Sequence, residues 1–153
     1  MQLTPVDFLI VAVTIVTVIL TVVLHHEVSS KVIFHIENKH YSKRKRMFTL
    51  VFSMICTHIA QIWMFAVASF LLLKAPDAGS IVYHAKVEFL DLVYLSASSF
   101  TTMGYGDIIP EGSIRFLYGT EAVTGFTLIT WSASLTFLEM QKHWLSYIRP
   151  SQD

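Results

Sequence analysis

The chain has 153 residues, of which 54% are hydrophobic and only 14% are charged, and its formal net charge is zero. A soluble domain of this size needs far more charged surface, so the composition indicates one membrane-embedded domain. Zero net charge gives no electrostatic basis for binding nucleic acid. The single cysteine, Cys56, excludes a disulfide framework and a cysteine metal site. Since the sequence carries no nucleotide loop, catalytic triad or metal motif, we expect neither an enzyme nor an organic cofactor.

The first predicted element is a transmembrane helix within residues 1–24. Thr4, Pro5 and Asp7 form a helix start with a capping box, and the chain is then almost entirely aliphatic up to Leu24. Twenty residues at about 1.5 Å each span roughly 30 Å, the thickness of the hydrocarbon core. No basic residue precedes the run and no small-residue cleavage site follows it, which disfavours a cleavable signal peptide.

Residues 25–46 are predicted to form a basic loop on the cytoplasmic side, because basic residues outnumber acidic ones there. This orientation places the N-terminus outside and the tail, residues 141–153, inside. The loop also has apolar residues at a spacing of four, and two interpretations are open. It forms a short helix on the inner leaflet, with anionic lipid contacting the basic cluster, or it is only a topology anchor. The cluster consists of Lys43, Arg44, Lys45 and Arg46.

A second spanning helix is predicted over residues 47–73, interrupted only by His58 and Gln61. An intramembrane histidine can sense protons or bind a metal. The more common case, which we favour, is a neutral histidine hydrogen-bonded inside the helix bundle. The remaining histidines are scattered without the spacing of zinc ligands, so we expect no metal site.

Residues 86–100, "KVEFLDLVYLSASSF", have apolar side chains at helical spacing but are too few to cross a bilayer. They form either a re-entrant helix or a helix lying on the outer surface. The stretch that follows, "TTMGYGDIIP", favours the re-entrant helix. Irregular backbone at membrane depth occurs only where it is buried in protein or lines a watery cavity.

The glycines of this stretch, Gly104 and Gly106, permit positive φ angles, so that successive carbonyl groups can point the same way. Four copies around an axis would stack rings of carbonyl oxygens that replace the water shell of a cation, and the Thr102 hydroxyl can add a further ring. The C-terminal end of the re-entrant helix would add a favourable partial negative charge. The sequence therefore predicts an ion path lined by backbone carbonyl groups.

A third span is predicted over residues 114–138. One of its faces is polar, which suits either a water-filled cavity or hydrogen bonding between helices. Gly125 is either a hinge or a close helix contact. Glu121 falls on the side away from this face, where it can hydrogen-bond Ser98, Ser99 or Thr101 or be held for stability alone. The predicted cavity lining comprises Phe126, Thr127, Thr130 and Ser134.

The segment "TTMGYGD" resembles the selectivity-filter motif of potassium channels, Thr-Val-Gly-Tyr-Gly-Asp, and the order of elements resembles the pore domain of bacterial two-helix potassium channels. The resemblance covers residues 47–140 and leaves residues 1–46 outside. It implies that Gly106 shapes the outer mouth, that Asp107 bonds back toward Tyr94, and that the Tyr105 ring packs into an aromatic cuff that favours potassium over sodium. The resemblance also favours the water-filled cavity for the polar face of the third span, because the inner helix of the family lines a cavity there. The implied ion-coordinating residues are Thr102, Met103, Gly104 and Tyr105.

Two positions depart from the family pattern. Met103 stands where valine or isoleucine is usual, and its unbranched side chain predicts a filter that conducts but collapses more readily at low potassium. Ser98 stands where some relatives carry a glutamate that pairs with the filter aspartate, and Glu121 is a candidate to compensate. The residues expected to support the filter are Thr101, Gly106, Asp107, Tyr94, Ser98 and Glu121.

The sequence as a whole predicts an all-α integral membrane protein with three transmembrane helices, a re-entrant pore helix and a filter loop. Four chains are needed to close the ring, most simply as a homotetramer. We expect a potassium-selective channel in a prokaryotic inner membrane. Two alternatives are a weakly selective cation channel and a non-conducting regulatory subunit.

Overall fold

The computed structural model describes residues 4–39 and 41–148, so residues 149–153 of the expected tail lie outside the described residues. It contains the helices α1 (Pro5–Asn38), α2 (Lys43–Leu72), α3 (Phe89–Phe100) and α4 (Arg115–Ile148). Two short strands, β1 (Ser80–Val82) and β2 (Ile109–Glu111), and a 3-10 turn, η1 (Gly112–Ile114), complete the described elements. The protein is therefore mostly helical, as predicted, with a small sheet that the all-α expectation omitted.

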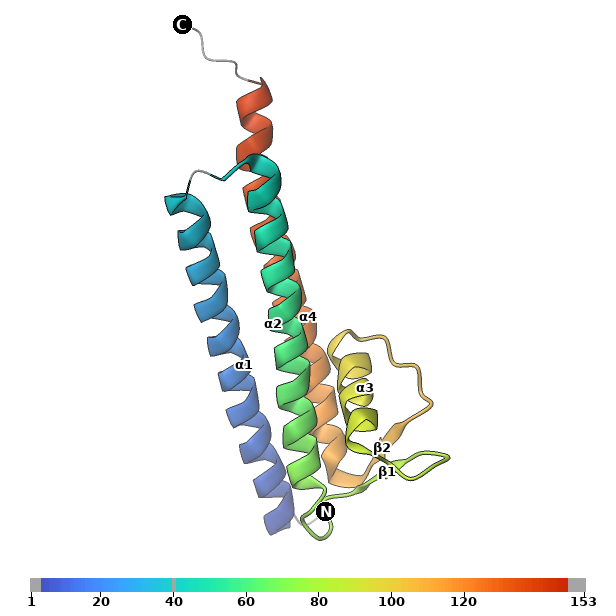
Figure 1. The fold of residues 1–153 in the computed structure, drawn as a ribbon. Coiled ribbons are helices and arrows are strands. Elements are labelled where there is room, and N and C mark those ends of the chain that lie inside the picture. Colours follow the sequence, from blue (N-terminus) through green and yellow to red (C-terminus); the bar gives the residue numbers. More distant parts are fainter. Residues whose placement is uncertain (1–3, 40, 149–153) are drawn as a thin grey trace, which may run out of the picture.

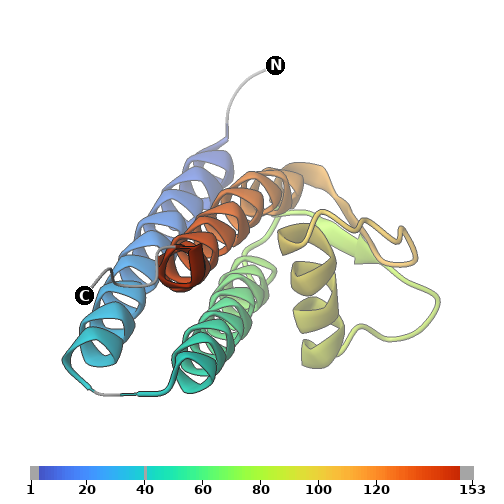
Figure 2. The same ribbon diagram turned by 90° about the horizontal axis from the view of Figure 1, so that it is seen from above.

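The three long helices run side by side, and α3 lies near one end of the bundle (Figure 1). Seen from above, α3 and the loop that follows it lie on the far side of α2 and α4 from α1 (Figure 2). The contacts agree, because α3 packs on both α2 and α4, while α1 packs on α2 and α4 from the other side. The loop is thus held at the edge of the single chain.

Helix α1 begins as predicted but is much longer than expected. The Thr4 hydroxyl accepts a hydrogen bond from the Asp7 N–H, which closes the capping box. The helix then continues to Asn38, so the predicted loop of residues 25–46 is wrong over most of its length. Ile36 packs against Leu50 and Met54 of α2. The second half of α1 is therefore a continuation of the bundle and not a separate helix on the inner leaflet.

The buried face of α1 is polar and its exposed face is aliphatic, the reverse of a helix in a soluble protein. Each buried hydroxyl donates to a carbonyl of its own helix; Thr14, for example, donates to the Ile10 oxygen at 2.7 Å. This local bonding removes the cost of burying the hydroxyl. The buried polar residues are Thr14, Thr17, Thr21, His25 and Ser29.

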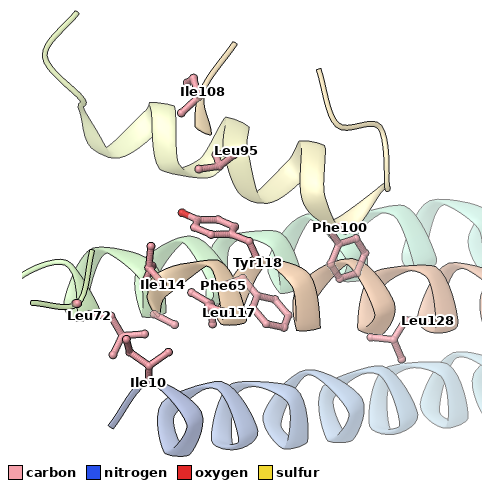
Figure 3. Close-up of a cluster of buried hydrophobic side chains, with 12 residues drawn as sticks. Ile10, Phe65, Leu72, Leu95, Phe100, Ile108, Ile114, Leu117, Tyr118 and Leu128 are labelled. Carbon is pink, nitrogen blue, oxygen red and sulfur yellow. The ribbon is translucent and has the colours of Figure 1, made fainter. Parts of the chain in front are cut away.

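The main hydrophobic cluster joins α2, α3 and α4 and reaches α1 through Ile10 (Figure 3). Phe65 of α2, Phe100 of α3 and Leu117 of α4 are fully buried in it. Beside the cluster, the Ser69 and Tyr118 hydroxyls form a buried hydrogen bond of 2.6 Å between α2 and α4. The end of α3 is therefore anchored against both neighbouring helices.

Strands β1 and β2 pair antiparallel, with Ile81 opposite Pro110. The pair joins the chain before α3 to the chain after the glycine-rich loop, so it closes the outer end of that loop. Nearby, the Ser113 hydroxyl donates to the Asp7 carboxylate at 2.5 Å, which ties η1 to the start of α1.

Among the described residues, two helices are long and apolar enough to cross a membrane, α1 and α2. The third expected span is longer than predicted: α4 has 34 residues, about 51 Å of helix. It is less apolar than the other two because threonines and serines recur along it.

At the end of the bundle away from α3, ion pairs join the three long helices. Arg46 of α2 donates to Glu139 of α4 at 2.7 Å, and the Glu139 side chain is only 8% exposed. Lys142 of α4 pairs with Glu37 of α1 at 2.9 Å. The basic cluster predicted to touch lipid is therefore partly engaged within the protein.

Replacing Arg46 by glutamine is expected to lower the free energy of unfolding by about 2 kcal/mol, because a nearly buried carboxylate loses a charged hydrogen-bond donor. Denaturation of the purified protein in detergent measures the change. The matched control is Lys31→Gln, which breaks an exposed pair with Glu27 and should cost less than about 0.5 kcal/mol. Equal effects of the two changes would contradict the assignment.

Candidate functional site

The candidate site is the loop that follows α3. Helix α3 has 12 residues, about 18 Å, so it cannot cross a bilayer. At its start, the Glu88 N–H donates to the Asp91 carboxylate at 2.7 Å. At its end, the Thr101 hydroxyl donates to the Ala97 carbonyl at 2.7 Å. The helix therefore has defined ends, and the loop begins directly from its C-terminus.

The loop backbone alternates between left-handed and ordinary conformations. Thr102, Gly104 and Gly106 have φ angles of +58°, +58° and +79°. Glycine adopts these angles freely, whereas a β-branched threonine does so at a cost of about 1–3 kcal/mol, which the surrounding structure must offset. This alternation lets consecutive carbonyl groups lie on one side of the strand.

The amide groups of the loop are directed to α3. The Met103 and Gly104 N–H groups donate to the Ser98 carbonyl at 2.9 and 3.3 Å, and the Thr102 N–H donates to the Ser99 carbonyl at 2.9 Å. The Ser98 hydroxyl accepts the Tyr105 N–H at 3.3 Å. Among the described residues, no hydrogen bond is recorded to the carbonyl oxygens of residues 102–105. The amides are thus anchored and the carbonyls are left available.

Tyr94 supports the outer part of the loop. Its hydroxyl donates to the Asp107 carboxylate at 3.1 Å, the hydrogen bond that the sequence predicts. Its ring is nearly parallel to that of Tyr105, with centroids 6.3 Å apart. The Tyr105 ring therefore turns back toward α3, although it is 66% exposed in the single chain.

Glu121 lies behind α3, on the fully buried side of α4. The expected hydrogen bond to Ser98, Ser99 or Thr101 is wrong, because neither carboxylate oxygen has such a partner among the described residues. Among the described residues, the buried Ser96 hydroxyl of α3 also lacks a hydrogen-bond partner.

Gly125 makes a close helix contact. A Cβ at this position would overlap the carbonyl oxygen of Phe100, and it would also crowd the Phe100 ring. Helix α4 is continuous through this point. The close-contact interpretation of Gly125 therefore fits the structure, whereas a hinge is not visible.

The predicted cavity residues share an exposed face of α4. Phe126, Thr127, Thr130 and Ser134 are all exposed in the single chain. The three hydroxyls donate to carbonyls of their own helix, as Thr130 does to the Phe126 oxygen at 2.6 Å. Within the described part of the chain, none of these hydroxyls bonds to another helix, so the face is free to line a space outside this chain.

Sequence reasoning named Ser98 and His58 but missed their partners. Ser98 was expected to support the loop, and its carbonyl and hydroxyl accept three of the loop amides. His58 was expected to be hydrogen-bonded inside the bundle, and it lies between Gln61 of its own helix and Ser132 of α4 at 2.9 and 3.0 Å. The polar residues within the second apolar run were the available signal, but their partners depend on which helices pack together.

A family model described as an ion channel matches residues 46–142. Comparison with curated proteins and with solved structures found no match. The matched region begins at the end of the basic cluster and includes α2, α3, the loop and most of α4. It leaves α1 outside.

Proposed function

Because the chain belongs to the ion-channel family of two-helix potassium-channel pores, we propose that it conducts potassium passively across a membrane through the backbone of residues 102–105. One observation carries the proposal. The φ angles are left-handed at alternate residues, the loop amides bond to α3, and no group among the described residues bonds to the loop carbonyls. Such a strand can replace the water around a dehydrated cation. The cation follows its electrochemical gradient without covalent chemistry.

A single chain supplies only one of the loops that would surround such a path. Residues 101–107 are all exposed, including Met103 at 56%. We therefore propose a homotetramer in which four loops face a common axis. The polar face of α4 then lines a water-filled cavity below the loops. The hydroxyls of Thr127, Thr130 and Ser134 contact the water that surrounds the ion there.

The proposed orientation has the start of α1 outside and the end of α4 in the cytoplasm, in the membrane of a prokaryote. It rests on the positive-inside rule for the basic cluster. Within that cluster Arg46 pairs with Glu139, and Lys45 lies over the Tyr41 ring at 4.5 Å. Arg44, which lies beside the apolar side chains of Phe48 and Phe52, is the residue that we propose contacts anionic lipid.

Potassium flux from liposomes that contain the purified protein tests the function, with barium as the blocker. We expect barium-sensitive flux. A weakly selective cation channel would pass sodium equally well, and a non-conducting subunit would give no flux and no fourfold assembly in detergent. Equal passage of sodium would contradict potassium selectivity, and the absence of flux and of fourfold assembly would contradict conduction through a homotetramer.

Replacing Tyr94 by phenylalanine is expected to make the conducting conformation of the filter less stable at low potassium. The change removes the hydrogen bond to Asp107, worth about 1 kcal/mol, but keeps the ring that stacks on Tyr105. The measurement is the persistence of potassium current as external potassium is lowered. We expect the variant current to decay severalfold faster.

The control for this change is Tyr83→Phe, at an exposed tyrosine just after β1. It should leave the decay rate unchanged. If the Tyr94 variant behaved like this control, the hydrogen bond to Asp107 would have no part in holding the loop.

A further inference from the structure

Two histidines meet inside the helix bundle, His25 of α1 and His58 of α2. Their rings stack with centroids 5.5 Å apart and an interplanar angle of 27°. The Trp131 ring of α4 lies 5.1 Å from His25, and the Phe100 ring of α3 lies 5.8 Å from His58. The pair therefore contacts every long helix and the end of α3, from which the loop starts.

His58 is part of a hydrogen-bonded relay across three helices. Gln61 donates its Nε2–H to the Thr21 carbonyl of α1 at 3.0 Å, so its Oε1 is left as an acceptor toward His58. His58 Nδ1 must then carry the hydrogen, and Nε2 accepts from the Ser132 hydroxyl of α4. A neutral His58 in this tautomer satisfies every member of the relay.

His25 is different, because it is fully buried and neither ring nitrogen has a hydrogen-bond partner among the described residues. The titratable group that faces it from another helix is His58. Around the pair, α4 contributes Trp131 beside His25 and Ser132 beside His58, and α3 contributes Phe100 beside His58, none of which is charged. On its own helix, the neighbouring His26 is exposed and lies 6.3 Å from the same Trp131 ring.

A metal is a poor fit to this pair. Among the described residues, no group of three or more histidine, cysteine, aspartate or glutamate side chains gathers in a way that could hold a metal ion. Both nitrogens of His58 are already engaged in the relay. A proton needs no third ligand, and each histidine can take one.

We propose that the His25–His58 pair is a proton-binding site that controls how firmly α1 is held against α2 and α4. A proton on His25 places a charge among apolar rings, where the Trp131 face is the available partner. A proton on His58 makes Nε2 a donor, so the Ser132 oxygen must accept from it and turn its own hydrogen elsewhere, while the ring gains a charge away from water. In both cases the charge favours separation of α1 and entry of water.

The consequence for transport rests on the proposed function. Ser132 lies on the same helix as the exposed face of Thr127 and Thr130, and Phe100 precedes the filter loop. Separation of α1 therefore affects both α4, which we propose lines the cavity, and the start of the loop that follows α3. Acid should change the rate of potassium flux severalfold, with the same midpoint as protonation of the pair.

Trp131 gives a readout that does not depend on flux. With Trp63 and Trp144 replaced by phenylalanine, Trp131 is the remaining tryptophan. A protonated imidazole in contact with an indole quenches its fluorescence. Titration from about pH 8 to about pH 4 should show one reversible transition. His25→Gln should abolish it, whereas the adjacent control His26→Gln should retain it.

Several results would overturn the proposal. One is a transition that survives His25→Gln or disappears in His26→Gln, and another is flux that stays constant across the fluorescence transition. His25→Asn is the second variant, and oligomer size on gel filtration checks that each variant assembles. If the wild-type chain passed no potassium, the proposed function would fail, but the fluorescence of Trp131 would still decide whether His25 binds the proton.

Discussion

Replacing Gly104 by alanine is expected to reduce potassium flux from liposomes to the level of empty vesicles while the oligomer stays intact. Gly104 has a φ of +58°, which an alanine adopts only at a cost of about 1–2 kcal/mol. The built Cβ meets no atom within 4 Å, so the chain folds without a clash. The residue instead relaxes toward negative φ, which turns its carbonyl away from the proposed axis.

Gly119→Ala is the matched control for flux. Gly119 lies in α4, where a Cβ also meets nothing within 4 Å and no positive φ is required. Alanine favours a helix over glycine by about 1 kcal/mol, so this variant should fold and conduct at least as well as the wild type. Normal flux from an assembled Gly104→Ala protein would show that the backbone of the loop does not carry the ion.

Replacing Gly125 by alanine is expected to destabilise the fold by at least about 2 kcal/mol, because the new methyl group would overlap the Phe100 carbonyl. Phe100 is fully buried and its side chain cannot move aside. The end of α3 must therefore shift away from α4, which also displaces the start of the loop that follows α3. Thermal unfolding in detergent measures the loss.

The same control, Gly119→Ala, separates this effect from helix propensity. Both glycines lie in α4, and only Gly125 touches another element. We expect the melting temperature to fall for Gly125→Ala and to stay or rise for Gly119→Ala. If the two variants melted at the same temperature, the close approach of α3 and α4 would be wrong.

Much of the helical architecture could be predicted from apolar runs and their flanking residues. The second helix was expected over residues 47–73 and is found at Lys43–Leu72. A short helix was expected over residues 86–100 and is found at Phe89–Phe100. The continuation of α1 past Leu24 was missed, because polar residues after an apolar run were interpreted as loop. Several of them are good helix formers, and their packing on α2 is a tertiary effect.

The candidate site was likewise predicted only in part. Local chemistry was enough to locate Gly104 and Gly106, whereas the pairing of Tyr94 with Asp107 came from the resemblance to potassium channels. The environment of Glu121 and the relay through His58 could not be derived, because each depends on which faces of separate helices meet. Periodicity indicates which face is buried but not against what.

The reversal potential with potassium on both sides of a bilayer and sodium as the replacing cation is the most direct measurement of the central claim. If carbonyl oxygens of four loops select potassium, the potential should shift by about 59 mV for each tenfold change in the potassium gradient. A potential that stays near zero while sodium replaces potassium would contradict it.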